Sequence, residues 1–275
     1  MEAREALRAL GERRPLVHHL TNYVTVNLVA NVTLCTGALP VMAQSIEEVE
    51  EMASAASALV INLGTLDSGF VESALAAGRV ANDRGAPVVL DPVGAGATTL
   101  RTRSAERVLS ELSVAAVCGN AGEVATLAGL SAEVRGVESL SLQNGDALAA
   151  TAAAARFLGT TVIATGPTDY VSGAGRTLAV ENGHPLMGRV VGSGCASTAV
   201  VGCFAAVVGD PGDTGSLDPE TAAAALAYFG RAGESAAEKA DGPGTLEPRL
   251  LDALAAFARE PDGLDGLRAG EVRAE

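Results

Sequence analysis

The chain has 275 residues, of which 48% are hydrophobic and only 3% are aromatic. This apolar content excludes a wholly disordered chain. The 19 basic and 33 acidic side chains leave a net charge of −14, which repels phosphate backbones, and few rings are available to stack on bases. Nucleic-acid binding is therefore excluded, as is docking on anionic membranes, which needs basic clusters.

The chain begins with a charged amphipathic segment, residues 1–10, rather than a basic stretch followed by an apolar signal region. Its longest apolar run, residues 199–209, is shorter than the roughly 18 residues that cross a bilayer. The four cysteines have no CxxC spacing, and the three histidines form no metal-binding motif. These features predict an acidic globular protein of the reducing cytoplasm, without a zinc site or a disulfide framework.

One local pattern recurs in the middle of the chain: a short apolar run, a polar residue and glycine, and then a helical stretch. The apolar runs are residues 59–61, 88–90, 114–117 and 162–163. Such runs, separated by Ala-rich helical patterns, are typical of buried parallel strands with crossover helices. The predicted fold class is therefore α/β, and ligands should bind at the carboxyl ends of these strands.

The flanking segments complete this outline. Helices are expected over 22–34, 196–208, 219–240 and 246–258, and a strand over 177–180 with a hairpin turn at Asn182–Gly183. Residues 209–217 have the composition of a loop, and no linker or internal repeat divides the chain. We expect one domain over residues 1–260 and a loosely ordered tail over 261–275.

A Gly-Ser-Gly turn, formed by Gly192, Ser193 and Gly194, opens directly into the helix expected at 196–208. Such a turn leaves backbone N–H groups free to hold an anion, although a plain glycine-rich helix start explains it equally well. Cys195 follows in the first helical turn. A thiol there can have a lowered pKa, although a need for a small buried side chain explains the cysteine equally well.

Two carboxylates follow neighbouring strands. Asp91 ends the Val-Val-Leu run, and Glu123 follows the next strand. Two carboxylates at adjacent strand ends suit Mg²⁺, which combines them with substrate phosphates and water. Taken singly, Asp91 fits a loop cap and Glu123 a first-turn helix acid equally well. Together with the anion-binding turn they suggest phosphoryl transfer, without a Walker A or protein-kinase motif.

Seven segments carry a resemblance to a known family. They are PLVHHLTNYVTVN (15–27), PVMA (40–43), LVINLGTL (59–66), VVLDPVGAGAT (88–98), GNAGE (119–123), IATG (163–166) and GSGC (192–195). Together they resemble the hydroxyethylthiazole kinase family over residues 15–254, and LDPVGAGAT joined to GSGC is a highly specific combination. The resemblance implies a ribokinase-like three-layer sandwich with a mostly parallel central sheet.

The resemblance also implies a function: transfer of the γ-phosphoryl group of ATP, with Mg²⁺, to the hydroxyl of 4-methyl-5-(2-hydroxyethyl)thiazole in thiamine salvage. It implies a homotrimer with active sites between subunits. The thiazole would contact Asn22, Met42, Gly64 and Gly192; the nucleotide would contact Thr165, Cys118 and Asn120. The anion hole would be Gly192, Ser193 and Gly194, with Cys195 where most ribokinase-like kinases have the aspartate that takes the hydroxyl proton, and Asp91 and Glu123 would hold the metal or its waters.

The chain departs from the family pattern at Cys118, where members often have an arginine that contacts ATP. A thiol cannot replace the bidentate donors of a guanidinium. Either another cation takes this role or nucleotide affinity is weak; the candidate cations are Arg101, Arg103, Arg176 and Lys239. Two alternatives to the thiazole kinase therefore stay open: a kinase of another small alcohol such as a hydroxymethylpyrimidine, and a weakly active thiazole-binding protein.

Overall fold

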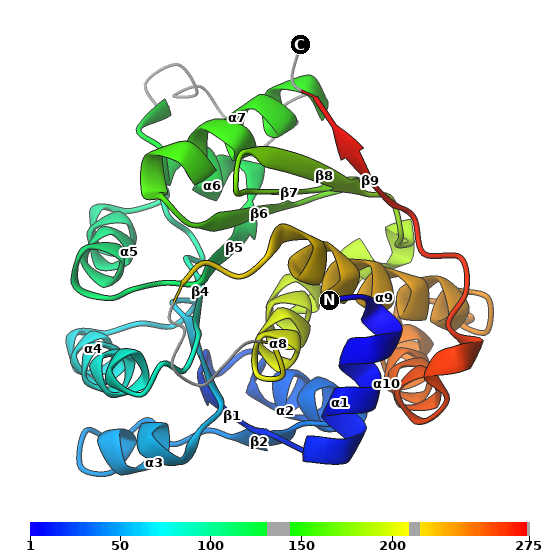
Figure 1. Ribbon diagram of the computed structural model, residues 1–275, viewed down its shortest axis with the longest axis horizontal. Helices are drawn as coiled ribbons and strands as arrows, with labels where there is room; N and C mark the ends of the chain where they lie inside the picture. Colours follow the sequence, from blue (N-terminus) through cyan, green and yellow to red (C-terminus); the bar gives the residue numbers. More distant parts are fainter. Residues whose placement is uncertain (131–143, 209–214, 274–275) are drawn as a thin grey trace.

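The computed structural model describes residues 1–130, 144–208 and 215–273 (Figure 1). Its strands form one nine-stranded sheet in the order β2-β1-β3-β4-β5-β6-β7-β8-β9. The six strands from β2 to β6 in this order are parallel, and β7, β8 and β9 add antiparallel. The strands are β1 (Leu16–Leu20), β2 (Leu39–Val41), β3 (Ala58–Asn62), β4 (Val88–Asp91), β5 (Ala116–Asn120), β6 (Thr161–Thr165), β7 (Asp169–Gly173), β8 (Arg176–Val180) and β9 (Ala269–Val272). The predicted α/β class with a mostly parallel central sheet is confirmed.

Helices cover both faces of this sheet and make three layers (Figure 1). One face carries α1 (Ala3–Arg13), α2 (Val26–Thr36), α8 (Ser193–Ala205), α9 (Pro219–Ala237) and α10 (Pro243–Arg259). The other carries α3 (Val49–Ala55), α4 (Ser68–Asp83), α5 (Thr99–Glu111), α6 (Ala121–Leu127) and α7 (Asn144–Leu158). Each face has its own apolar cluster, because the side chains of each buried strand alternate between the two faces.

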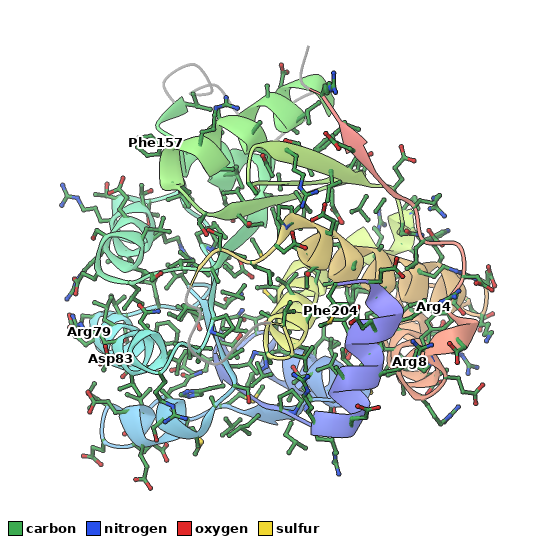
Figure 2. All side chains as sticks on the ribbon, in the orientation of Figure 1. Arg4, Arg8, Arg79, Asp83, Phe157 and Phe204 are labelled. Atoms are coloured by element: carbon green, nitrogen blue, oxygen red, sulfur yellow. The ribbon has the colours of Figure 1, made fainter. Side chains whose placement is uncertain are left out.

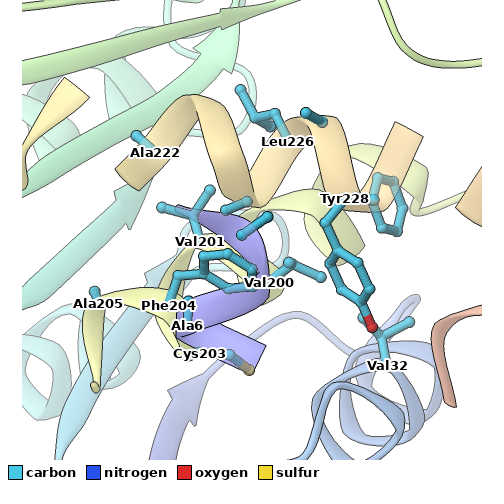
Figure 3. Packing of buried hydrophobic residues seen from close by; sticks show 14 of the residues in the cluster. Ala6, Val32, Val200, Val201, Cys203, Phe204, Ala205, Ala222, Leu226 and Tyr228 are labelled. Atoms are coloured by element: carbon cyan, nitrogen blue, oxygen red, sulfur yellow. The ribbon is translucent and has the colours of Figure 1, made fainter. Parts of the chain in front are cut away.

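Helix α8 is the centre of the first layer and is apolar nearly all round. It packs against the sheet, α2 and α9. Gly202 allows the close approach to β3, since a Cβ there would lie 2.4 Å from Val60 Cγ2. On its outer side Phe204 stacks on Tyr228 of α9 with ring centroids 5.9 Å apart (Figure 3). This packing fixes the helix whose N-terminus carries the Gly-Ser-Gly turn.

Two expectations from the sequence need correction. The helix expected from residue 22 begins at Val26, because Asn22 Oδ1 accepts the N–H groups of Val24 and Thr25 and holds a turn there. The hairpin turn lies at Ala174–Gly175, where both residues have positive φ, and not at Asn182–Gly183. The Asn182 side chain is instead engaged by Glu234 and Gly266.

The tail also differs from the expectation of a loosely ordered segment over 261–275. A short 3-10 turn, Pro261–Gly263, leads through the buried Leu264 to β9, which pairs with β8. An edge strand is held by main-chain hydrogen bonds and needs no apolar periodicity, so composition could not reveal it. Arg4 and Arg8 of α1 pair with Asp265 and Asp262 of this segment (Figure 2).

Of the loop expected over 209–217, residues 209–214 lie outside the described residues. Within the described part of the chain, no helix is both long and apolar enough to cross a membrane.

Candidate active site

Polar side chains end four neighbouring parallel strands at one edge of the sheet. Asn62 of β3 lies opposite Asp91 of β4, and Asn120 of β5 lies opposite Thr165 of β6. The N-terminus of α8, beginning at Ser193, reaches the same edge, since Cys195 contacts Asn62. The strand ends and the helix N-terminus therefore form one site, where parallel sheets bind ligands.

The side-chain amide of Asn62 is the hub of a buried cluster. Its Oδ1 accepts the N–H of Gly64 at 3.0 Å and Nδ2 of Asn22 at 2.9 Å. A backbone N–H can only donate, so this contact fixes the orientation of the amide. Nδ2 of Asn62 then donates to Asp91 Oδ2 at 2.6 Å and to Cys195 Sγ at 3.2 Å. All four hydrogen-bonding positions of the amide are used.

The orientation of Asn22 is fixed in the same way. Its Oδ1 accepts the N–H groups of Val24 and Thr25, each at 3.0 Å, so its Nδ2 faces Asn62 and Cys195 Sγ, the latter at 3.5 Å. The sulfur of Cys195 thus receives two amide N–H donors. Two N–H donors directed at one acceptor stabilise negative charge at the position of this sulfur.

Burial raises the pKa of the half-buried Cys195 thiol, and the neighbouring Asp91 carboxyl raises it further, against the lowering effect of the amide donors. The lowered pKa suggested by the helix position is therefore wrong. Proximity to a carboxyl and loss of solvent outweigh the helix N-terminus, and the thiol is protonated at neutral pH.

The two carboxylates at the site are both perturbed by burial. Burial and the charge of Glu123 raise the pKa of Asp91 to about 8. Burial also raises the pKa of Glu123, whose oxygens accept the N–H of Gly94 at 2.7 Å and of Asn120 at 2.8 Å. Because Asn120 in turn caps α6, Glu123 closes a capping box and braces the glycine-rich loop after β4.

The Gly-Ser-Gly turn opens onto a cavity of about 500 Å³. Gly192 has a φ of +93°, and a Cβ there would lie 2.5 Å from Thr25 Cγ2, so only glycine fits. Ser193 and Gly194 line the cavity, and Thr165 lies on its wall. The free N–H groups of α8 and a cavity large enough for a small ligand therefore adjoin each other.

A family model for the hydroxyethylthiazole kinase family matches residues 7–260 of this chain. The chain belongs to the hydroxyethylthiazole kinase family. A hydroxyethylthiazole kinase of Rubrobacter xylanophilus is 70% identical over the full length of both chains, and one of Methanosphaerula palustris is 49% identical over 94% of each.

Solved structures agree with this assignment. The structure of a hydroxyethylthiazole kinase protein from Pyrococcus horikoshii is 43% identical, with a TM-score of 0.84 over 98% of this chain and 99% of that one. A ribokinase-like superfamily protein from Enterococcus faecalis is 15% identical, with a TM-score of 0.63 over 92% of this chain and 88% of that one. The second likeness concerns the fold alone, and the predicted ribokinase-like fold is confirmed.

Three of the four residues that family resemblance assigns to the thiazole lie together in the fold. A Cβ on Gly64 would lie 2.9 Å from Asn22, and Gly192 packs on Thr25 of the same turn. Half-buried Met42 follows β2, where His18 Nε2 lies 2.8 Å from the Ala43 carbonyl oxygen. The Asn62 cluster is thus bordered by Asn22, Gly64 and Gly192.

The residues assigned to the nucleotide lie on the adjacent strands β5 and β6, but only Thr165 is among the residues that line the cavity. Thr165 faces the cavity and donates to the Gly119 carbonyl at 3.2 Å. The Asn120 side chain is engaged by its helix cap, and Cys118 is buried, with burial raising its pKa well above the ordinary value. Among the candidate cations, Arg101 braces the Leu63, Gly64 and Val93 carbonyls, and Arg176 pairs with Asp218 and Glu220.

The oxygen donors of Asp91 and Glu123 fit Mg²⁺ in type, since hard cations prefer carboxylates. In the part of the chain that the structure describes, no three His, Cys, Asp or Glu side chains gather to hold a metal ion. A cation here would therefore need substrate phosphates and water to complete its coordination, which is how Mg²⁺ is ordinarily bound beside nucleotides.

Sequence reasoning did not assign three polar residues of this site. Asn62 was visible as the polar end of its strand, but its role depends on partners 40 and 29 residues away. Thr198 donates to Asp91 Oδ2 at 3.3 Å from one turn into α8. Asp169 lines the cavity, and its Oδ1 accepts the Gly166 N–H at 2.8 Å, while burial raises its pKa to about 7.

Proposed function

We propose that this chain transfers the γ-phosphoryl group of ATP to the hydroxyl of 4-methyl-5-(2-hydroxyethyl)thiazole, as its family membership implies. One observation carries the assignment of the site. The N-terminus of α8 borders the Asn62 cluster through Cys195 and the cavity through Ser193 and Gly194. A phosphoryl group held there would lie between an acceptor on one side and a nucleotide on the other.

The lining of the cavity supports this orientation of ATP. Its lining includes five apolar residues, Pro167, Pro185, Met187, Leu226 and Phe229. Apolar side chains suit the flat face of a purine, whereas the N–H groups at Ser193 and Gly194 suit phosphates. We therefore place the base against α9 and the triphosphate against the start of α8.

In the reaction, the hydroxyl oxygen of the thiazole forms a bond to the γ-phosphorus, the bond from that phosphorus to the β,γ-bridging oxygen breaks, ADP leaves, and the hydroxyl proton is released to water. The transition state of such transfers is loose, so alignment and charge stabilisation matter more than early removal of the hydroxyl proton. The N–H groups of Gly192 to Gly194 would stabilise charge on the transferred group. Cys195, protonated at neutral pH, would line the acceptor position and contribute little as a base.

We also propose that Asp91 and Glu123 hold Mg²⁺ or its waters. When bound, the cation neutralises charge on the β- and γ-phosphates. Asn62 and Thr198 both donate to Asp91 Oδ2 and thereby fix the orientation of the carboxyl. Chelation with EDTA should abolish turnover, and added Mg²⁺ should restore it.

The homotrimer with shared sites is part of the same proposal. Three apolar side chains next to thiazole residues in the sequence are highly exposed in the single chain, with exposed fractions of 73% for Tyr23, 70% for Val24 and 74% for Val191. Tyr23 and Val24 follow Asn22, and Val191 precedes Gly192. A second copy covering them would enclose the thiazole. The four cysteines are free thiols, which supports a location in the reducing cytoplasm.

One coupled assay tests the function: purified protein with ATP, Mg²⁺ and the hydroxyethylthiazole. ADP formation that depends on the thiazole supports the proposal. Faster turnover of a hydroxymethylpyrimidine would favour a different small-alcohol kinase. Thiazole binding by calorimetry without ADP would favour a binding protein, the alternative that the Cys118 departure motivates.

A further inference from the structure

The outer wall of the cavity is the segment from Asn182 to Gly188, which connects β8 to α8. It lies directly on α9 at two glycines. A Cβ on Gly230 would lie 2.5 Å from the Asn182 carbonyl oxygen, and one on Gly233 would lie 2.1 Å from Met187 Sδ. The wall therefore packs closely on α9, through its main chain at Gly230 and through the Met187 side chain at Gly233, and polar contacts also join the two.

Those polar contacts converge on Glu234 of α9, whose side chain is only 17% exposed. Its Oε1 accepts the Gly183 N–H at 3.0 Å, Asn182 Nδ2 at 3.2 Å and the Arg268 guanidinium at 2.5 Å. Arg231 approaches the other oxygen at 3.6 Å. One carboxylate thus joins the cavity wall to the helix beneath it.

The C-terminal segment holds the same wall from the other side. Arg268 donates its N–H to Asn182 Oδ1 at 2.6 Å and its guanidinium to the Glu181 carbonyl at 2.6 Å. Asn182 Nδ2 donates to the Gly266 carbonyl at 3.0 Å, and the Glu181 N–H donates to the Arg268 carbonyl at 2.9 Å. The start of the wall is therefore fixed between α9 and the segment that leads into β9.

We propose that Glu234 and Arg268 are positioning residues for the nucleotide, which hold the Asn182–Gly188 wall at the spacing that the base of ATP requires. Neither residue needs to touch the nucleotide, since Glu234 acts through Gly183 and Asn182, and Arg268 acts through Glu181 and Asn182. The inference rests on the proposed function, because it takes this cavity as the nucleotide site.

The inference separates nucleotide affinity from thiazole affinity. The wall belongs to the cavity on the Thr165 side, whereas Asn22, Gly64 and Cys195 lie on the other side of the α8 N-terminus. Loosening the wall should raise the KM for ATP and leave the KM for the thiazole unchanged. A general loss of stability would affect both constants alike, or neither.

Two variants test this. Glu234→Gln keeps the shape of the side chain but removes its charge, and Arg268→Ala removes the exposed partner without disturbing α9. We expect each to raise the KM for ATP about tenfold, with kcat within about twofold of the wild type. Arg268→Lys keeps the charge and should recover part of the affinity.

Glu111→Gln is the matched control, because Glu111 also accepts from two arginines, Arg79 and Arg107, but on α4 and α5 away from the cavity. It should lower thermal stability without changing either KM. An unchanged KM for ATP in both Glu234→Gln and Arg268→Ala would overturn the inference.

Calorimetric titration of each protein with a non-hydrolysable ATP analogue gives an independent reading. If the wild type binds the analogue but phosphorylates no thiazole, the proposed function fails while the inference is still tested by the affinities. Weaker analogue binding in both variants supports it, and unchanged binding contradicts it. A wild type that binds no nucleotide contradicts both.

Discussion

Asn62 and Asp91 lie opposite each other on adjacent strands, and the Asn62 amide donates to the Asp91 carboxyl at 2.6 Å. The same Nδ2 donates to Cys195 Sγ, so one side chain links the base of the site to the first turn of α8. Because the Gly64 N–H fixes the amide orientation, this link cannot rotate away. Asn62 therefore sets the relative position of the carboxyl and the thiol.

Replacing Asn62 by Asp should damage catalysis more than folding. The variant keeps the acceptor for the Gly64 N–H but replaces the donor with a second carboxylate beside Asp91. We expect kcat to fall about 100-fold, since small displacements of reacting groups are costly. Asn82→Asp is the control, because Asn82 bridges to Ser113 on the surface between α4 and β5. Equal losses of kcat in both variants would contradict this role.

The function of Cys195 is tested by two substitutions. If the anion-binding turn and Mg²⁺ provide most of the rate, Cys195→Ala should keep measurable activity, with kcat lowered about 10- to 100-fold. Cys195→Asp, which introduces the carboxylate of other ribokinase-like kinases, should remain active. Steady-state kinetics decides, and complete inactivity of both variants would indicate specific thiol chemistry.

Asp169 should make stability depend on pH. Burial raises its pKa from 3.8 to about 7, so the folded chain binds a proton between these values that the unfolded chain releases. The stabilisation is complete below pH 4 and is lost as the pH rises through 7. Asp169→Asn keeps the acceptor for Gly166 and should raise the free energy of unfolding at pH 8 by about 2 kcal/mol, because the carboxyl is partly open to solvent.

Urea denaturation at pH 5 and pH 8 measures this effect. The difference between Asp169→Asn and the wild type should be small at pH 5 and appear at pH 8. A difference of the same size at both values would mean that the substitution acts through packing and not through ionisation.

Cys118→Arg should strengthen nucleotide binding at some expense of stability. The thiol lies beside Thr198, and burial raises its pKa most, with the charges of Asp91 and Asp169 raising it further. A guanidinium there would lie near both carboxyls and near the cavity that Asp169 lines. We expect the KM for ATP to fall about tenfold, while overpacking of this buried position lowers the unfolding free energy by about 1–3 kcal/mol.

Cys118→Met separates charge from volume, since it adds bulk without a donor. It should share the loss of stability and leave the KM for ATP unchanged. A lower KM in both variants, or in neither, would remove the argument that the missing arginine limits nucleotide affinity in this chain.

The strand ends of the site could be predicted from the sequence because each apolar run stops at a polar residue followed by glycine. The Gly-Ser-Gly turn could also be predicted, since the positive φ of Gly192 requires glycine. The orientation of the Asn62 amide could not be predicted, because it depends on the Gly64 N–H and on the Asn22 side chain from a separate loop. The pKa of Cys195 could not be predicted either, since it depends on burial and on Asp91 rather than on its helix position.

The structure of the C-terminal segment could not be predicted from the sequence for a different reason. β9 is held by main-chain bonds to β8, and the segment before it by the side chains of Asn182 and Arg4. None of these contacts leaves an apolar pattern in residues 261–275. The contact between the cavity wall and Glu234 could not be predicted for the same reason, since it joins segments about 50 residues apart in the sequence.

The exposed apolar residues beside the thiazole site should decide the oligomeric state. Tyr23 and Val191 are 73% and 74% exposed, and both adjoin residues assigned to the thiazole. If three copies cover them, Tyr23→Ser combined with Val191→Ser should shift the sedimenting mass from three chains toward a single 27.5 kDa chain. Phe157→Ser is the control, because Phe157 is 69% exposed on the outer face of α7 (Figure 2). Since the site would lie between subunits, dissociation should raise the KM for the thiazole together with the loss of mass. A wild type that sediments as one chain, with full activity, would contradict the shared site.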